Sequence, residues 1–364
     1  MRFPSLPTGR VLVALALLVC TSGRAAAHPP ADSSDADATS WYAFPTVFYT
    51  PETSLGLGAA GGLFVGAEAD RPSSLQGDIS ATLNGQYALN LRPEWYRQAG
   101  RQRVFGDIAL STYPDVFYGL GPEAPDEQEE DFTSRYLDAV LQAEQQVGTD
   151  WRVGLRSRVR REVVTEEETG GLLDDSALPG HDASTVVGLG PLAARDTRDR
   201  LFYPRRGQFV TAYLVVHPEA LGSTFGFTRV VLDARQYVPL GWGHTLAVQA
   251  YGEAVSGTAP FSVLPRLGGP LRMRGYLEGR FRDDVYATAQ AEWRFPIRGR
   301  FDGALFAGAG AVAGRLDALG ADGLETAGGA GIRYRLNAEG VHIRLDYAVG
   351  REGGGLYITA RDPF

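Results

Sequence analysis

The sequence predicts an all-β fold, a sixteen-stranded antiparallel β-barrel that spans a membrane. Segments of strand length repeatedly alternate apolar with polar residues, which is typical of β-strands with one apolar and one polar face. Long and short connections follow one another along the chain, as in barrels with short turns at one end and longer loops at the other. No segment sustains a helical period, so one all-β domain fits the length better than two soluble domains.

The clearest strand ends the stretch 264–297, in which a loop rich in Gly and Arg is followed by unbroken alternation. Its apolar face carries Val285, Ala287, Ala289, Ala291, Trp293 and Phe295, and its polar face carries Tyr286, Thr288, Gln290, Glu292 and Arg294. A strand that is apolar on one side and charged on the other suits a barrel with lipid outside and water inside.

Residues 1–27 have the pattern of an export signal, with arginines ahead of an apolar run and Ala25-Ala26-Ala27 as a cleavage site. The apolar run is too short to span a bilayer as a helix. A lipid anchor at Cys20 is an alternative, which the large Val19 before it disfavours. We expect residues 28–40 to form a flexible leader and residues 41–364 to form the barrel.

Composition excludes several functions. Cleavage after Ala27 removes three arginines and changes the formal net charge from −8 to −11, which argues against nucleic acid as a partner. The chain has no Lys, which excludes a Walker A lysine, a Schiff-base lysine and a lysine general base. We therefore expect no enzyme activity, cofactor, nucleotide or metal, and we expect outer-membrane lipid as the surrounding partner.

Sixteen strands follow from the alternation. They are predicted to start near residues 43, 55, 74, 86, 102, 134, 151, 183, 207, 225, 244, 284, 301, 325, 340 and 355. Loops near 115–131, 166–182, 258–283 and 317–323 are long, whereas the turns between them are short. An even number of strands places both termini on the same side, which we expect to be the periplasm of a Gram-negative type of bacterium.

The strand starting near 151 carries four arginines on one face: Arg152, Arg156, Arg158 and Arg160. An arginine that faces lipid near the bilayer midplane costs about 2–4 kcal/mol, so this face must line a wet lumen. A soluble sandwich or lipocalin-like barrel is the alternative. It is disfavoured because the apolar faces contain mainly Ala, Gly and Val, with Trp and Tyr near the strand ends.

Two further motifs have simpler explanations. The run 56–61 matches G-x-G-x-x-G, but a dinucleotide fingerprint needs a helix directly after the glycines, and strand alternation continues here. The acidic run 126–131 could hold a cation, although a solvated external loop explains it more simply. The sequence has no G-x-S-x-G or H-E-x-x-H motif to support hydrolytic chemistry.

Met273-Arg274-Gly275-Tyr276 resembles the V-R-G-F/Y motif in the sixth external loop of the BamA/TamA family of outer-membrane assembly barrels, also called the bacterial surface antigen family. Residues 48–53 look like the first hairpin of that family, and residues 291–296 look like its twelfth strand. The periplasmic turn before its ninth strand is similar to a segment that contains Asp196, Asp199, Pro204 and Gly207. The resemblance covers the whole predicted barrel.

In that family, the loop folds back into the lumen and its arginine meets acidic groups on the wall. By resemblance, Arg274, Gly275 and Tyr276 form a loop latch, and we predict a bond from Arg274 to Glu292 in the lumen. The family's second acidic position falls at Gly308, so we expect that partner to be missing. The alternative is that Arg274 is a solvated loop residue.

Leu356, Ile358 and Phe364 are predicted to share one face of the final strand, with Phe364 as an aromatic C-terminal assembly signal. Pro45 and Gly353-Gly354-Gly355 should weaken the seam where the first and last strands pair. The family's periplasmic POTRA domains have no counterpart in residues 28–40, so we expect partner proteins to supply any such domain.

Two functions remain open. The first is a non-enzymatic role in envelope biogenesis, inserting proteins or lipids through the weak seam. The second is a passive channel whose lumen is lined by the arginines of residues 152–160. A third, adhesive role would use the acidic loops to bind a partner.

Overall fold

The computed structural model describes residues 39–66, 72–125, 128–174, 177–200, 203–321, 323–336, 342–359 and 363–364. The predicted export signal 1–27, Cys20 and most of the predicted leader lie outside these residues. The first strand already begins at Thr39, slightly before the expected start of the barrel.

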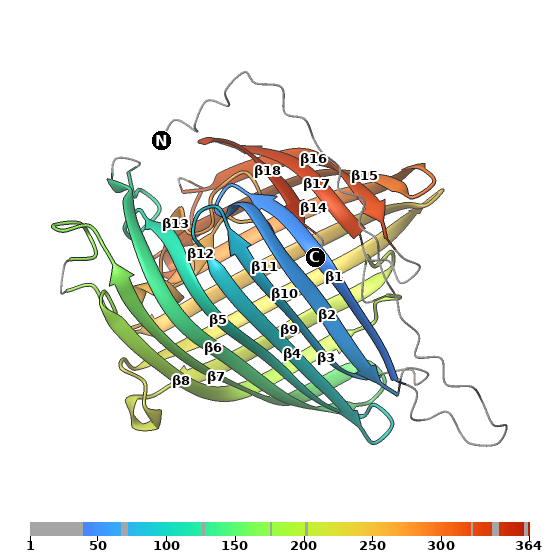
Figure 1. The fold of residues 1–364 in the computed structure, drawn as a ribbon, viewed down its shortest axis with the longest axis horizontal. Coiled ribbons are helices and arrows are strands. Elements are labelled where there is room, and N and C mark those ends of the chain that lie inside the picture. Colours follow the sequence, from blue (N-terminus) through green and yellow to red (C-terminus); the bar gives the residue numbers. More distant parts are fainter. Residues whose placement is uncertain are drawn as a thin grey trace.

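Sixteen strands form one closed antiparallel barrel (Figure 1). The strands are β1 Thr39–Thr50, β2 Ser54–Val65, β3 Ser73–Thr82, β4 Tyr87–Arg97, β5 Gln102–Phe117, β6 Glu130–Val147, β7 Trp151–Glu166, β8 Ala183–Asp196, β9 Gly207–His217, β10 Phe227–Gly241, β11 His244–Gly257, β14 Val285–Arg298, β15 Phe301–Ala313, β16 Glu325–Arg335, β17 His342–Gly350 and β18 Gly353–Thr359. Each strand pairs with its neighbour along the chain, and β1 closes the barrel against β18. The predicted fold class and strand number are confirmed.

Two additional strands of two residues each, β12 Arg266–Leu267 and β13 Phe281–Arg282, pair with each other inside the connection from β11 to β14. Short 3-10 helices are described at Phe261–Val263 in the same connection, and at Glu219–Leu221 and Leu316–Ala318 in two others. None of the helices in the described residues is long and apolar enough to cross a membrane.

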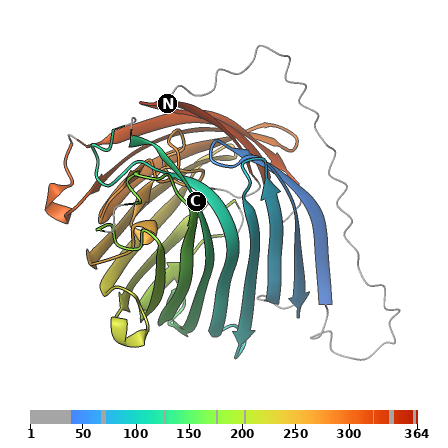
Figure 2. The same ribbon diagram turned by 60° about the vertical axis from the view of Figure 1, so that its left-hand side comes forward.

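The two ends of the barrel differ in their connections (Figure 2). The connections from β5 to β6, β7 to β8, β11 to β14 and β15 to β16 are long and lie at one end, which we call the long-loop end. At the other end, the short-turn end, strands are joined by brief turns such as 148–150 and 242–243. Both the first and the last strand have their free ends at the short-turn end.

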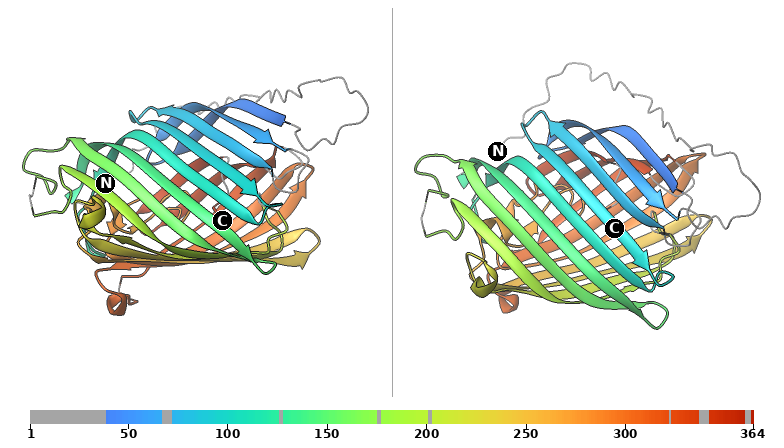
Figure 3. Two further views of the ribbon diagram at one scale, coloured as in Figure 1. Left: turned by 90° about the horizontal axis from the view of Figure 1, so that it is seen from below. Right: turned by 60° about the horizontal axis from the view of Figure 1, so that its bottom comes forward.

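Residues alternate between the two faces of the wall, as a period of two requires. Along β17, His342, Arg344 and Asp346 are buried inside, whereas Leu345, Tyr347 and Val349 are exposed outside. A soluble protein would hide its apolar side chains, but here large apolar residues cover the outer surface of nearly every strand. The strands form a wall around an interior (Figure 3). Many charged side chains are buried on the inner side of this wall.

Candidate functional site: the lumen loop and its ion cluster

The connection from β11 to β14, residues 258–284, folds into the barrel interior, and we call it the lumen loop. Leu267, Met273, Tyr276 and Phe281 are buried in one apolar cluster with residues of the barrel wall. The wall contributes Val231, Tyr251, Tyr286 and Val312 to this cluster. Apolar contacts of this kind hold the loop inside, although its sequence is rich in Gly and Arg.

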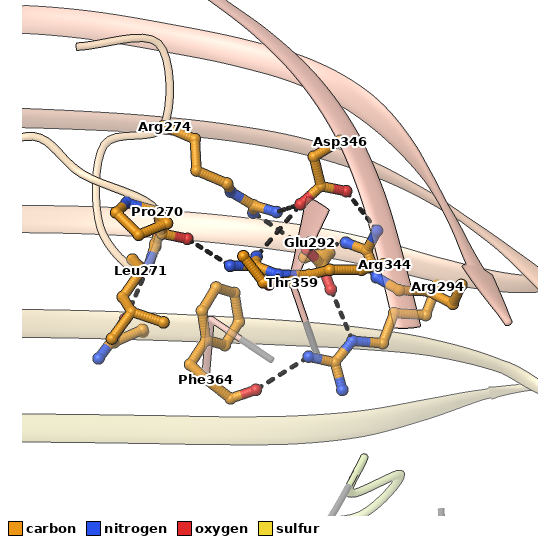
Figure 4. Close-up of polar contacts among 12 residues, drawn as sticks. Pro270, Leu271, Arg274, Glu292, Arg294, Arg344, Asp346, Thr359 and Phe364 are labelled. Carbon is orange, nitrogen blue, oxygen red and sulfur yellow. Dashed lines mark hydrogen bonds and ion pairs between the residues drawn. The ribbon is translucent and has the colours of Figure 1, made fainter. Parts of the chain in front are cut away.

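Arg274 lies at the inner tip of the lumen loop (Figure 4). Its guanidinium donates to the Glu292 carboxylate at 3.0 Å and to the Asp346 carboxylate at 2.6 Å. The guanidinium carbon also stacks over the Phe306 ring, 3.4 Å from its centroid. Arg274 therefore connects the loop to β14, β15 and β17 at once.

Three wall arginines join the same two carboxylates. Arg333 bridges Glu292 and Asp346, Arg294 donates to Glu292 at 2.8 Å, and Arg344 donates to Asp346 at 3.1 Å. We define the lumen ion cluster as Arg274, Glu292, Arg294, Arg333, Arg344 and Asp346, all of which are at most 2% exposed. Burial on this scale is costly unless every charge has partners, so the cluster stabilises one arrangement of loop and wall.

Four guanidinium groups and two carboxylates give the cluster an excess of positive charge, and further guanidinium N–H groups donate to other oxygen acceptors. Arg344 donates to the Pro270 carbonyl of the lumen loop at 2.7 Å and to the Thr359 hydroxyl of β18 at 2.6 Å. Arg294 donates to the Phe364 carbonyl at 2.9 Å. The cluster thus reaches the loop, the last strand and the residues beyond that strand.

The expectation that Arg274 lacks a second acidic partner is wrong. Gly308 does stand on β15, the strand after Glu292, where a side chain would approach the Met273 sulfur. The second carboxylate instead comes from Asp346 on β17, two strands further round the wall. The alternation of β17 already placed Asp346 on the polar face, but sequence offers no measure of how far across the lumen Arg274 reaches.

Gly275 and Tyr276 fix the loop tip to the barrel near the seam. Gly275 has a φ of 111°, and its N–H donates to the Tyr357 hydroxyl of β18 at 3.0 Å. A side chain at Gly275 would meet the backbone of Val349 at 2.9 Å, so only glycine fits. The Tyr276 hydroxyl donates to Glu325 at 2.7 Å and accepts from the Arg351 N–H at 3.0 Å.

The four arginines of β7 lie on the inner side of the wall, and two of them form ion pairs with Asp138 of β6. Arg158 and Arg160 contact its carboxylate at 2.6 and 3.0 Å. Arg156 stacks over the Tyr213 ring at 4.4 Å, and Arg152 donates to the Gly100 carbonyl at 2.9 Å. Each of the four positive charges therefore has a partner on the wall.

The turn from β8 to β9 is held by its acidic residues. Asp196 forms a two-pronged pair with Arg198 at 2.9 and 2.8 Å, and Asp199 accepts from the Arg205 N–H at 2.9 Å. Gly207 has a φ of 101°, and a side chain at this position would collide with the Thr197 carbonyl, so only glycine fits.

Pro204 and its neighbour Tyr203 belong to the same turn and contact lumen residues at the short-turn end. The Pro204 carbonyl accepts from Arg294 at 3.4 Å, and the buried Tyr203 ring packs, tilted, against the His342 ring with centroids 4.1 Å apart. Tyr203 was not identified from the sequence, because a lone aromatic in a polar turn gives no periodic signal.

The prediction that Phe364 shares the lipid-facing side of the final strand is wrong. β18 ends at Thr359, and Phe364 is buried inside against Tyr237 and Ala247, with its carbonyl bound by Arg294. Pro363 lacks an N–H and cannot donate to a strand ladder, which favours leaving the wall. The role of Phe364 as an assembly signal stays a prediction.

The family of the chain follows from its sequence, since a model of the Omp85 superfamily domain matches residues 72–355. The chain belongs to the Omp85 superfamily. The barrel fold of this superfamily indicates the outer membrane as the location of the protein. The resemblance to BamA-type barrels predicted from the lumen loop is thereby confirmed.

Solved structures show the same barrel fold at low identity. The chain is similar to BamA from Haemophilus ducreyi lacking POTRA domains 1-3, with a TM-score of 0.62, 15% identity, and coverage of 88% of this chain and 70% of that chain. It is also similar to CdiB from Acinetobacter baumannii and CdiB from Escherichia coli, both with a TM-score of 0.55 and 11% identity. These matches cover 88% and 87% of this chain but only 59% and 62% of the CdiB chains. No curated protein sequence matches the chain.

Proposed function

We propose that this barrel acts without enzymatic chemistry in outer-membrane biogenesis and assists the insertion of proteins or lipids through the seam between β1 and β18. We place the short-turn end and both termini in the periplasm, and the long-loop end outside the cell. Envelope-assembly proteins that carry periplasmic domains are its proposed partners.

The weak pairing of β1 with β18 is the observation that carries this proposal. A single residue pair, Tyr49 with Ile358, is in register across the seam. Every other pair of adjacent barrel strands has at least six registered pairs within the described residues. Strand edges without partners can accept another strand, so this edge of β1 suits transient pairing with a client.

The lumen loop contacts both sides of the seam. On the β18 side, Gly275 donates to Tyr357, and on the β1 side, the Glu278 N–H donates to the Glu52 carboxylate in the β1–β2 turn at 3.1 Å. Separation of β1 from β18 must therefore strain or break one of these contacts, which couples the loop to the seam.

Locking the seam with a disulfide tests the proposal. Tyr49→Cys and Ile358→Cys replace the registered pair, whose outward side chains are suitably close for a disulfide, in a background with Cys20→Ser. We expect the oxidised variant to lose envelope function in cells, measured as barrier integrity and outer-membrane protein content, and to recover it on reduction.

Leu214→Cys with Val230→Cys is the matched control, because this registered outward pair joins β9 and β10 away from the seam. Its oxidation should leave the envelope unchanged. If the oxidised seam variant supports a normal envelope, lateral opening is not the mechanism.

Planar-bilayer recording separates this function from a passive channel. We expect a small, flickering conductance, since the charges of Arg158 and Arg160 are already balanced by the carboxylates of Asp138 and Glu162. A large, steady, anion-preferring conductance would favour the channel instead.

A further inference from the structure

Strands β6 and β7 each carry an arginine on their outer face, in addition to the four inward arginines of β7. Arg135 and Arg161 are exposed on the outside, among apolar side chains such as Leu137 and Val159. Neither forms an ion pair with a carboxylate in the part of the chain that the structure describes. Arg161 is oriented by one bond, from its guanidinium to the Thr185 hydroxyl at 2.8 Å.

The two outward arginines are close neighbours. Arg161 lies opposite Leu137, and Arg135 lies two residues from Leu137 on the same face. Such diagonal positions are roughly 7–8 Å apart on adjacent strands, so two flexible guanidinium groups can converge on one anion. Two like charges at this spacing repel each other on an apolar wall unless an anion lies between them.

Their height on the wall matches the boundary of a membrane. Arg161 is ten positions above Trp151, the exposed aromatic residue at the short-turn end of β7. Ten residues of a strand tilted by about 40° rise about 25 Å, which is the height of the apolar band of such barrels. The exposed Tyr87 ring, at the long-loop end of β4, marks the same boundary.

A groove of about 790 Å³ runs from these arginines across the outer wall of β6, β5, β4, β3 and β2. Its floor is the backbone of Gly58, which has no side chain, and of Ser80, Ala88 and Ser111, whose side chains turn inward; these residues are paired in register. Its walls are outward side chains: Leu57, Ile79, Leu89, Leu110 and Leu137. The site is thus apolar along its length and basic at one end.

We propose that Arg135 and Arg161 bind the phosphate of an anionic membrane lipid in the outer leaflet, with the lipid's acyl chain lying in this groove. Guanidinium groups bind phosphate oxygens through paired, charge-assisted hydrogen bonds. The apolar walls favour a lipid over a free ion, because free phosphate would leave them unused. This site depends on the barrel spanning a membrane with its long-loop end outside, and it is independent of seam opening.

Native mass spectrometry of the detergent-solubilised chain tests the site. The probes are a bisphosphorylated glucosamine lipid of the lipid A type, phosphatidylglycerol, and net-neutral phosphatidylcholine. We expect the two anionic lipids to bind at least about tenfold more tightly than phosphatidylcholine. Arg135→Gln with Arg161→Gln should abolish this preference, and Ala81→Phe, which fills the groove but keeps both arginines, should weaken binding of all acyl lipids.

Arg97→Gln with Arg298→Gln is the control, because it removes two exposed arginines at the short-turn end. This variant should keep the preference for anionic lipids. Equal binding by the two double variants would overturn the proposal, as would unchanged binding after Ala81→Phe. Displacement of the lipid by inorganic phosphate alone would show that a free ion, and not a lipid, occupies the site.

Discussion

The last strand, β18, is held very differently along its two edges. On one edge it forms seven registered pairs with β17, from Arg344 with Thr359 to Gly350 with Gly353. On the other edge it has one registered pair with β1. The β17 side is further supported by the lumen ion cluster, whereas the β1 side is connected mainly through the lumen loop. A barrel can therefore be closed in topology and still be uneven in the strength of its closure.

Asp346→Asn weakens the lumen ion cluster on the β17 side of β18 and should lower the free energy of unfolding more than the other variants. The substitution leaves four buried guanidinium groups with one carboxylate, and breaking a buried ion pair costs about 3–5 kcal/mol. The free energy of unfolding in detergent, followed by circular dichroism and by gel mobility, measures the loss. Asp317→Asn is the control, because its pair with Arg315 is exposed, and it should cost under about 1 kcal/mol. Similar losses in both variants would contradict a stabilising role for the cluster.

Tyr357→Phe tests the contact between the lumen loop and β18. Its effect on stability should be intermediate. It removes the hydroxyl that accepts from the Gly275 N–H and leaves this buried donor without a partner, which costs about 1–3 kcal/mol. Hydrogen exchange should speed up in residues 268–276 more than elsewhere. Tyr347→Phe removes a hydroxyl from the exposed outer face of β17 and should leave exchange in the loop unchanged. Unchanged exchange in Tyr357→Phe would show that this bond does not hold the loop.

Glu52→Gln tests the β1 side of the seam and should have the smallest effect on stability. Burial raises the pKa of Glu52, in the β1–β2 turn, to about 7. The folded state therefore binds a proton more tightly than the unfolded state, so the resulting stabilisation is fully present below about pH 4.5 and is lost as pH rises through about 7. Melting temperatures from pH 5 to 8 should fall less in Glu52→Gln than in the unaltered protein. Glu123→Gln, at an exposed loop position, is the control for loss of a carboxylate. If melting temperature falls equally with pH in the unaltered protein and in both variants, Glu52 does not have a raised pKa.

The strands were predictable from sequence because membrane and lumen impose opposite demands on alternate residues. Strand starts at residues 102, 151, 183, 207, 244, 301 and 325 agree with the structure. The largest errors, near 43 and 134, arose where β1 and β6 begin earlier than their apolar alternation, at Thr39 and Glu130. The inward direction of Glu292 and Arg344 followed from the same alternation.

Contacts across the lumen were less predictable, because alternation gives a direction but no distance. Arg274 and Asp346 are 72 positions apart in the chain and meet only through the curvature of the wall. Tyr203 and Phe364 enter the lumen from non-strand segments, where no period exists to place them. The motif around Arg274 identified the loop, but the barrel geometry decided which carboxylates it contacts.

The bridging position of Arg274 also constrains the order in which the molecule can be assembled. Its two carboxylates belong to β14 and β17, so the tip of the loop cannot reach its full set of partners until β17 has joined the wall. Before β17 joins the wall, Arg274 lacks the Asp346 carboxylate and the loop lacks half of its acidic anchor. We therefore expect the loop to dock fully only after the final strands have been added.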